Sequence, residues 1–437
     1  MDVLLQHPAP DTRGTDSFWN NPFAWLRQKK LGRAFWVFFT AAFFFDAGFA
    51  VYFFLFNLYL LDCGFKERAI GLVGGAFTFG TVLGTLPAGL LARKIGVKRL
   101  LVCCFVAAPL VNTVRTVWMG EAAQVGFAFL AGLAMCTWGV CFLPAVARLT
   151  TEGKRASAFS LIFSVSIGTS ALGGVVCGYL PQWLRVAGFA MQAAEVKRLI
   201  LQVSCGIALV GLIAVLRLRI PPPTAAEGLA EIQPSGRNWF GGWKVHPFLL
   251  RFLPLMALWS AILAAFTPFS NVYLERGLHI PFARIGLIFS SAQLVQLCLG
   301  LLTPVVFRLL GLINGIVATQ IAAAVALAVM AGVRDERLAV AFYLTFYAAQ
   351  WMSSPGLYNL LMNETPDKER STAAAMTLFC NALAGSAATA GAGILFARFG
   401  YPLTLLGIAL LALVVAILFR TLIARSPGTW RCNRDAR

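Results

Sequence analysis

The chain has 437 residues, of which 59% are hydrophobic and only 12% are charged. This composition excludes an ordinary soluble protein, which needs far more charge to cover its surface. The formal net charge of +18 does not indicate nucleic-acid binding, because the basic residues lie at the ends of apolar stretches rather than on one basic face. Apolar stretches of about 20 residues recur along the chain, and each is long enough to cross a bilayer as a helix. The sequence therefore predicts an all-α membrane protein.

Two sets of six spans are predicted, separated by a linker. An N-terminal segment, residues 1–34, precedes a first bundle at 35–219, with spans near 35–61, 69–92, 98–118, 123–149, 157–180 and 199–219. The linker, 220–247, begins with three prolines, which end the sixth helix because proline lacks an N–H donor. A second bundle at 248–424 has spans near 248–274, 283–307, 312–332, 337–361, 371–397 and 401–424, and a basic tail, 425–437, follows.

The placement of the basic residues predicts the orientation. Lysine and arginine are concentrated in the N-terminal segment, the linker, the tail and the loops on the same side of the predicted spans. Cytoplasmic loops carry such an excess, so both termini and the linker are expected in the cytoplasm. No cleavable signal peptide is expected, because residues 1–34 are polar and the first apolar run has full membrane length. We therefore expect a multi-pass protein of the plasma (inner) membrane, surrounded by the lipid bilayer.

An internal repeat relates the two bundles. The pattern Asn-x-Tyr-Leu ends the first span at residues 57–60 and the seventh span at residues 271–274, an offset of 214 positions. A second echo, at a similar offset, pairs residues 144–158 with residues 355–373. Two such echoes predict duplicated halves around a shared axis, a common construction in transporters.

The loop after the second span carries the most specific motif. It runs from Gly89 through Leu90, Leu91, Ala92, Arg93, Lys94, Gly96 and Lys98 to Arg99, and the glycines, Leu91 and the basic cluster match the pattern of a known family. With this motif, the six-plus-six spans and the related halves, the chain resembles the major facilitator superfamily. The resemblance implies two pseudo-symmetric six-helix bundles with about twelve spans. It also implies a gating role for this loop, although Arg93 stands where the family has Asp. Glu152, in the next cytoplasmic loop, is a candidate partner for the basic cluster; alternatively, these residues only anchor the spans at the interface.

Asp46 is the strongest candidate for coupling transport to protons. It lies about 11 residues into the first span, whereas every other Asp or Glu falls in a loop or near a span end. An ionised carboxylate near the bilayer centre costs at least about 2.5–3.5 kcal/mol, so such a group faces protein or water, finds a partner, or holds its proton. The alternative is a structural Asp that fixes helix packing.

Other polar and aromatic residues inside spans are candidates for lining a solute cavity. Asn57 lies three helical turns from Asp46 on the same face. The remaining candidates are Trp138, Gln293, Gln296, Tyr347, Gln350, Trp351 and Asn381. For each, contacts between helices without any solute are the alternative. Arg115 is expected to extend its side chain to the membrane interface, and pairing with Asp46 is the alternative.

These residues favour a secondary active transporter that moves a small solute by alternating access, with protons as a coupling partner through Asp46 and export ahead of uptake. Proton-coupled metabolite uptake and a non-transporting membrane sensor are the alternatives. An enzyme is not expected. The three histidines, His7, His246 and His279, lie outside the spans or at their edges, and no metal-ligand spacing or phosphate-binding loop is present. No cofactor, catalytic residue or nucleic-acid partner is expected, and the chain is expected to be a monomer.

Overall fold

A computed structural model describes residues 31–186, 188, 191–220, 247–365 and 370–423. Throughout these residues the regular structure is helical. The N-terminal half contains the helices α3 (Arg33–Asp62), α4 (Glu67–Ile95), α5 (Val97–Arg115), α6 (Glu121–Leu149), α7 (Glu152–Val186) and α8 (Ala193–Arg217). The C-terminal half contains α10 (Pro247–Phe266), η2 (Thr267–Phe269), α11 (Ser270–Val272), η3 (Tyr273–Gly277), α12 (Phe282–Leu310), α13 (Leu312–Gly332), α14 (Glu336–Glu364) and α15 (Arg370–Ile423).

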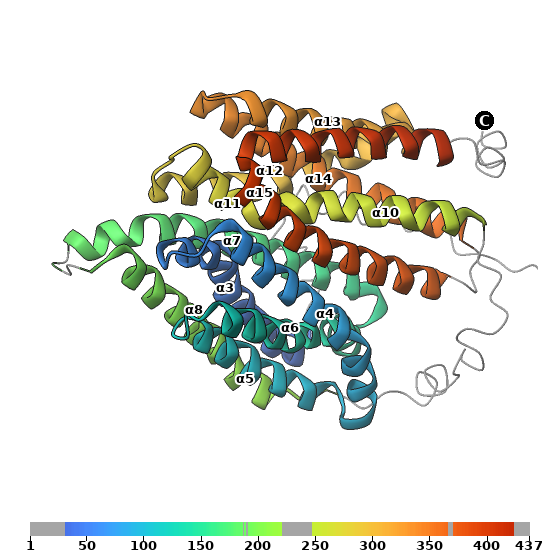
Figure 1. The fold of residues 1–437 in the computed structure, drawn as a ribbon. Coiled ribbons are helices and arrows are strands. Elements are labelled where there is room, and N and C mark those ends of the chain that lie inside the picture. Colours follow the sequence, from blue (N-terminus) through green and yellow to red (C-terminus); the bar gives the residue numbers. More distant parts are fainter. Residues whose placement is uncertain (1–30, 187, 189–190, 221–246, 366–369, 424–437) are drawn as a thin grey trace, which may run out of the picture.

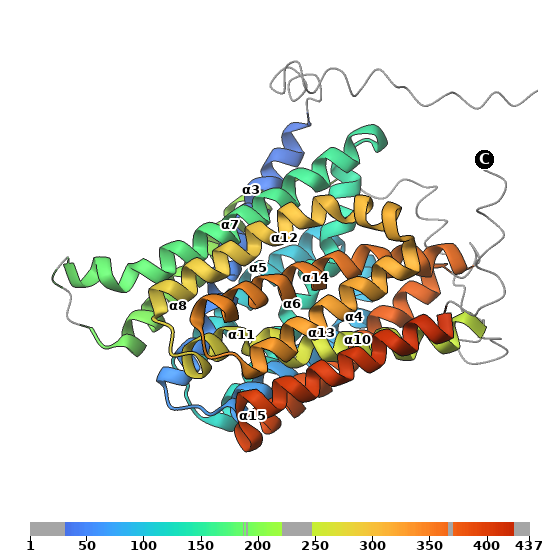
Figure 2. The same cartoon turned by 90° about the horizontal axis from the view of Figure 1, so that it is seen from above.

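The two halves form two helical bundles that pack side by side. Figure 1 shows the N-terminal half, coloured blue to green, below the C-terminal half, coloured yellow to red. The helices run roughly along one direction, as the view from above also shows (Figure 2). We call the end at which α3 leads into α4 the distal end, and the end at which α3 begins and α15 finishes the terminal end. The expected all-α fold of two related bundles is confirmed.

The described part of the chain forms twelve long helical segments, called rods below, that run through the two bundles. Ten helical segments of the described chain are long and apolar enough to span a membrane. One of them, α15, contains two rods, because Gly400 interrupts it with φ 73° and ψ 179°, a conformation that glycine adopts without strain. The twelfth rod, α14, is 29 residues long but is not among those ten. Its central stretch carries tyrosine, glutamine, tryptophan and serine side chains.

The repeat is visible in how each half ties its first helix to its third. The Tyr59 hydroxyl donates to the backbone oxygen of Thr116, 2.7 Å away. The Tyr273 hydroxyl donates to the backbone oxygen of Met330, 2.9 Å away. The two tyrosine donors are 214 positions apart in the sequence, and so are the two acceptors. The tyrosine of the repeated pattern therefore has the same position in each half.

Matching turns begin the third helix of each half. Gly96 precedes α5 with φ 88° and ψ 150°, and Gly311 precedes α13 with φ 79° and ψ 158°. L-residues rarely adopt this backbone conformation, so glycine is required at both turns.

The halves differ in their first helices. Helix α3 is continuous over 30 residues, whereas its counterpart α10 ends at Phe266 and continues through the 3₁₀ turn η2 and the π-helical turn η3. Pro268 lies in η2, and its ring removes one backbone N–H donor from the helical ladder. The distal end of this first helix of the C-terminal half is therefore built from short turns rather than one regular helix.

Candidate functional site

Asp46 lies near the middle of α3, as the fourteenth of its 30 residues. Its carboxyl group lies beside the side chains of Ser166 on α7 and Trp138 on α6. A narrow crevice between α3 and α7 surrounds it, lined by Phe39, Ala42, Phe43, Ile162, Val165, Ser166 and Thr169. Asp46 is half-buried, and its carboxyl group has the side chains of Ser166 and Trp138 as polar neighbours.

An aromatic cluster backs the Asp46 site. The Trp138 ring lies 5.9 Å from Phe38, 5.0 Å from Phe45 and 5.6 Å from Phe105, measured between ring centroids. Phe38, Phe45 and Phe105 are fully buried, which fixes the Trp138 indole between α3, α5 and α6. Trp138, expected to line a cavity, therefore packs into the N-terminal half and presents its edge toward Asp46.

Arg115 is buried, which contradicts the expectation that it extends to the interface. The residue is 3% exposed, and its guanidinium donates to the side-chain oxygen of Asn112 at 3.0 Å. The guanidinium carbon lies 4.1 Å from the centre of the Phe56 ring. An amide oxygen and an aromatic face give the cation a binding place inside the half, so it does not need the interface. Phe56 is ten residues beyond Asp46, about 15 Å along α3, so Arg115 does not pair with Asp46.

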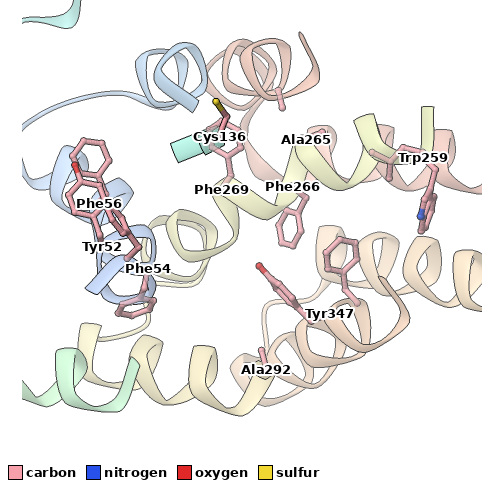
Figure 3. Packing of buried hydrophobic residues seen from close by; sticks show 14 of the residues in the cluster. Tyr52, Phe54, Phe56, Cys136, Trp259, Ala265, Phe266, Phe269, Ala292 and Tyr347 are labelled. Carbon is pink, nitrogen blue, oxygen red and sulfur yellow. The ribbon is translucent and has the colours of Figure 1, made fainter. Parts of the chain in front are cut away.

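The C-terminal half presents buried polar atoms that lack partners. The Tyr347 hydroxyl is hydrogen-bonded to the Ser270 hydroxyl at 2.8 Å. By contrast, the side-chain oxygens of Gln350 and Asn381 and the indole nitrogen of Trp259 are buried and, within the described part of the chain, have no hydrogen-bond partner. Trp259 and Phe266 are both on α10, and Figure 3 shows Trp259 farther along this helix, away from Phe266 and Tyr347. Buried polar atoms are normally satisfied, so these are places where water or a bound solute would donate or accept.

The remaining cavity candidates on α12 and α14 have different surroundings. Gln293 and Gln296 are both half-buried on α12. Trp351, on α14, is 47% exposed, and its indole packs over Gly300 of α12. These placements bring Trp351 next to the polar face of α12.

Asparagine side chains connect the two halves. The side-chain amide of Asn57 on α3 donates to the backbone oxygen of Pro268, 2.7 Å away in the other half. Asn57, expected to line a cavity, thus faces the partner half but is already engaged there. The Ser290 hydroxyl of α12 likewise donates to the backbone oxygen of Ala171 on α7.

Glycines allow the halves to approach closely toward the distal end. A Cβ atom added to Gly71 of α4 would lie 2.8 Å from the Gly393 Cα atom of α15, and one added to Gly174 of α7 would clash with Gly286 of α12. Toward the terminal end of the same helices, Gly89 of α4 and Gly168 of α7 have open space around the Cβ position. The close backbone contacts between the halves are therefore at Gly71 and Gly174, not at Gly89 or Gly168.

Two ion-paired groups lie at the distal end, and the sequence reasoning did not single them out. Lys197 Nζ of α8 lies 3.0 Å from Asp62 Oδ2 and 3.7 Å from Glu275 Oε1 of the other half. Arg276 Nη1 lies 3.2 Å from Glu67 Oε1 of α4, and the same oxygen accepts a hydrogen bond from the Tyr401 hydroxyl at 3.0 Å. Their positions at span ends resemble interface anchors in sequence, so only the fold reveals their partners.

The gating-loop residues lie at the terminal end of α4 and the start of α5. Lys98 Nζ donates to the backbone oxygen of Leu216 at 3.0 Å, which satisfies a carbonyl in the last turn of α8. Arg99 is exposed. The side chains of Arg93 and Glu152 lie outside the described part of the structure, so their pairing stays a prediction.

Comparison with known families places this architecture. The family model of the Major Facilitator Superfamily matches residues 37–389. The chain belongs to the major facilitator superfamily. It is thus a multi-pass membrane protein of a transporter family rather than an enzyme family. Among curated proteins, none matches the chain.

Solved structures of the superfamily share the fold. The nucleoside transporter NupG superposes with a TM-score of 0.73 at 14% identity, over 90% of this chain and 100% of its own. The D-xylose–proton symporter gives a TM-score of 0.67 at 14% identity, over 88% and 95%. The inward open xylose transporter XylE from E. coli gives 0.68 at 13% identity, over 90% and 97%. At these identities the likeness shows the superfamily fold.

Proposed function

We propose that the chain is a secondary active transporter that moves a small solute by alternating access and couples it to protons through Asp46. The observation that carries this proposal is a carboxyl group near the middle of a membrane-spanning helix, partly exposed and beside Ser166 and Trp138. Such a group is energetically unfavourable in a helix that only needs to pack. Its cycle of protonation supplies the coupling step.

The proposed solute is small and amphiphilic or weakly polar. The N-terminal half offers the half-buried Trp138 ring, and the C-terminal half offers unpartnered neutral atoms at Trp259, Gln350 and Asn381. Neutral donors and acceptors with aromatic walls suit a solute that carries few charges. The proposal keeps export ahead of uptake, with both termini in the cytoplasm of the plasma (inner) membrane and the chain working as a monomer.

Proton-coupled uptake is the second candidate. The D-xylose–proton symporter, one of the structurally similar proteins, is named for proton symport, which supports this candidate. A membrane sensor that transports nothing is a third reading, and it would bind a solute without moving it.

Flux in proteoliposomes tests the proposal. Purified protein is reconstituted, a solute that raises its thermal stability is chosen from a panel, and uptake and release are followed with and without a pH gradient. We expect the native protein to respond to the gradient and Asp46→Asn to bind the solute without responding. Asp46→Glu, which keeps the carboxyl group, is the matched control and should retain gradient-driven flux. Unchanged gradient dependence in Asp46→Asn contradicts proton coupling through this residue.

A further inference from the structure

The asparagines of the repeated pattern make reciprocal contacts across the two halves. Asn57 Nδ2 donates to the Pro268 backbone oxygen at 2.7 Å, and Asn271 Nδ2 donates to the Phe54 backbone oxygen at 3.1 Å. The two donors are 214 positions apart, and the two acceptors are also 214 positions apart. Each half therefore contributes one amide donor and one carbonyl acceptor, as in a self-complementary contact around a two-fold axis.

We propose that Asn57 and Asn271 are positioning residues that hold the distal ends of the two halves together, and that both amides release their carbonyls whenever the distal end opens. The inference rests on the alternating access proposed above. It assigns to this asparagine pair the two contacts that must break together in each cycle.

The surroundings of the pair strengthen the contact. Asn271 is 8% exposed and Phe54 is 1% exposed, so the hydrogen bond between them is shielded from water. The Phe54 ring packs against Phe289 of α12, 4.7 Å between centroids, which seals the same level of the interface. Figure 3 shows Phe54 on α3 pointing toward the neighbouring half. A hydrogen bond in a dry environment is stronger than one in water, so the buried Asn271 bond, together with the part-buried Asn57 bond, biases the distal end toward the closed state.

The Pro268 carbonyl is unusual as an acceptor. It lies in the 3₁₀ turn between α10 and η3, whereas the equivalent Phe54 carbonyl lies inside continuous α3. A turn of this kind leaves backbone carbonyls less fully engaged than a regular helix does. The break in the C-terminal half's first helix thus places the Pro268 carbonyl opposite Asn57.

The pair is neutral, unlike the ion pairs nearby. Lys197–Glu275 and Arg276–Glu67 also cross between the halves at the distal end, and both weaken when salt screens charge. An amide-to-carbonyl bond does not depend on salt in this way. The asparagine pair therefore keeps the distal end closed over a range of ionic strength in which the ion pairs change.

Hydrogen–deuterium exchange tests the inference without any solute. The native protein, Asn57→Leu, Asn271→Leu and the double variant are reconstituted in nanodiscs, and exchange is followed by mass spectrometry. Leucine keeps the size of asparagine and removes the amide donor. We expect the double variant to exchange about tenfold faster in distal segments 54–70 and 268–286, and more slowly in terminal-end segments 79–95 and 294–310. Raised salt should not abolish the difference.

Another asparagine provides the control, and two exchange patterns would contradict the proposal. Asn363 Nδ2 donates to Asn359 Oδ1 within α14, an exposed amide contact that does not join the halves, so Asn363→Leu should leave the pattern unchanged. Faster exchange at both ends indicates loss of fold and overturns the proposal, as does unchanged exchange at the distal end. If the leucine variants do not fold, Asn57→Ser and Asn271→Ser, which keep a shorter donor, must show intermediate distal exchange. If the double variant shows faster distal and slower terminal-end exchange but the native protein shows no gradient-driven flux, the transporter proposal is wrong and this inference still holds.

Discussion

Arg276 and Glu67 face each other across the two halves, with Nη1 and Oε1 3.2 Å apart. Glu67 begins α4 of the N-terminal half, and Arg276 lies in η3 of the C-terminal half. The Tyr401 hydroxyl donates to the same carboxylate oxygen, so one acidic side chain gathers two groups of the other half. This relationship makes the distal end sensitive to the charge of a single residue.

Removing that charge should weaken distal closure modestly. In Glu67→Gln the amide oxygen still accepts from Tyr401, but the ion pair with Arg276 is lost. Because the Arg276 side chain is 41% exposed, we expect a loss of only about 1 kcal/mol in the free energy of unfolding. Denaturation in mixed detergent micelles measures it. Arg284 and Glu336 form a pair whose side chains are 60% and 42% exposed, so Glu336→Gln is the control and should change stability less. An equal loss of unfolding free energy in Glu67→Gln and Glu336→Gln would show that the Glu67 ion pair stabilises the protein no more than an exposed pair does.

The buried lysine should matter more. The Lys197 side chain is 5% exposed, lies between the carboxylates of Asp62 and Glu275, and has its ammonium group 4.9 Å from the centre of the Phe282 ring. Lys197→Met leaves two carboxylates close together without a cation, so we expect the free energy of unfolding to fall by about 3 kcal/mol. The same micelle denaturation measures it.

A second substitution separates charge from packing in that experiment. Adding Asp62→Asn to Lys197→Met removes one uncompensated carboxylate, so the double variant should be more stable than the sum of the single changes predicts. Strict additivity would show that the ion pair contributes little and that lost packing explains the lysine's effect.

The turns before α5 and α13 should reject a side chain. Gly96 and Gly311 have φ values of 88° and 79°, so alanine at either position should cost about 2 kcal/mol in unfolding free energy. Gly89→Ala is the matched control, because Gly89 lies within α4 and has open space around its Cβ position. That control should be neutral or slightly stabilising. Thermal unfolding followed by intrinsic tryptophan fluorescence ranks the three variants, and equal midpoints would refute the argument.

The membrane architecture and the repeat could be predicted from sequence because both depend on local patterns. Span length and hydropathy identify helices one at a time, and an offset of 214 positions relates Asn57 to Asn271 before any fold is known. What the offset could not predict was the partner of each amide. That depends on how far the halves approach, which the close packing at Gly71 and Gly174 determines.

Residues near span ends were the hardest to interpret. Arg115 was expected at the interface, and that prediction was wrong because Asn112 and the Phe56 ring form a buried place for its guanidinium. Lys197, also near a span end, was not singled out from the sequence, although it is buried between Asp62 and Glu275. A sequence shows the depth of a charged residue along its own helix, but not which neighbouring helix faces it. The depth of Asp46 was predictable, whereas the nearness of Ser166 was not.

The polar character of α14 has a consequence for how the protein is made. Its tyrosine, serine and glutamine side chains keep it outside the group of helices that are apolar enough to cross a bilayer by themselves. A segment of this kind leaves the translocon poorly when it is alone, because lipid offers its polar atoms no partners. It packs directly against α12 and α13, which precede it in the chain. Biogenesis should therefore retain those two earlier helices beside the translocon until α14 emerges, so that the three enter the bilayer as a group.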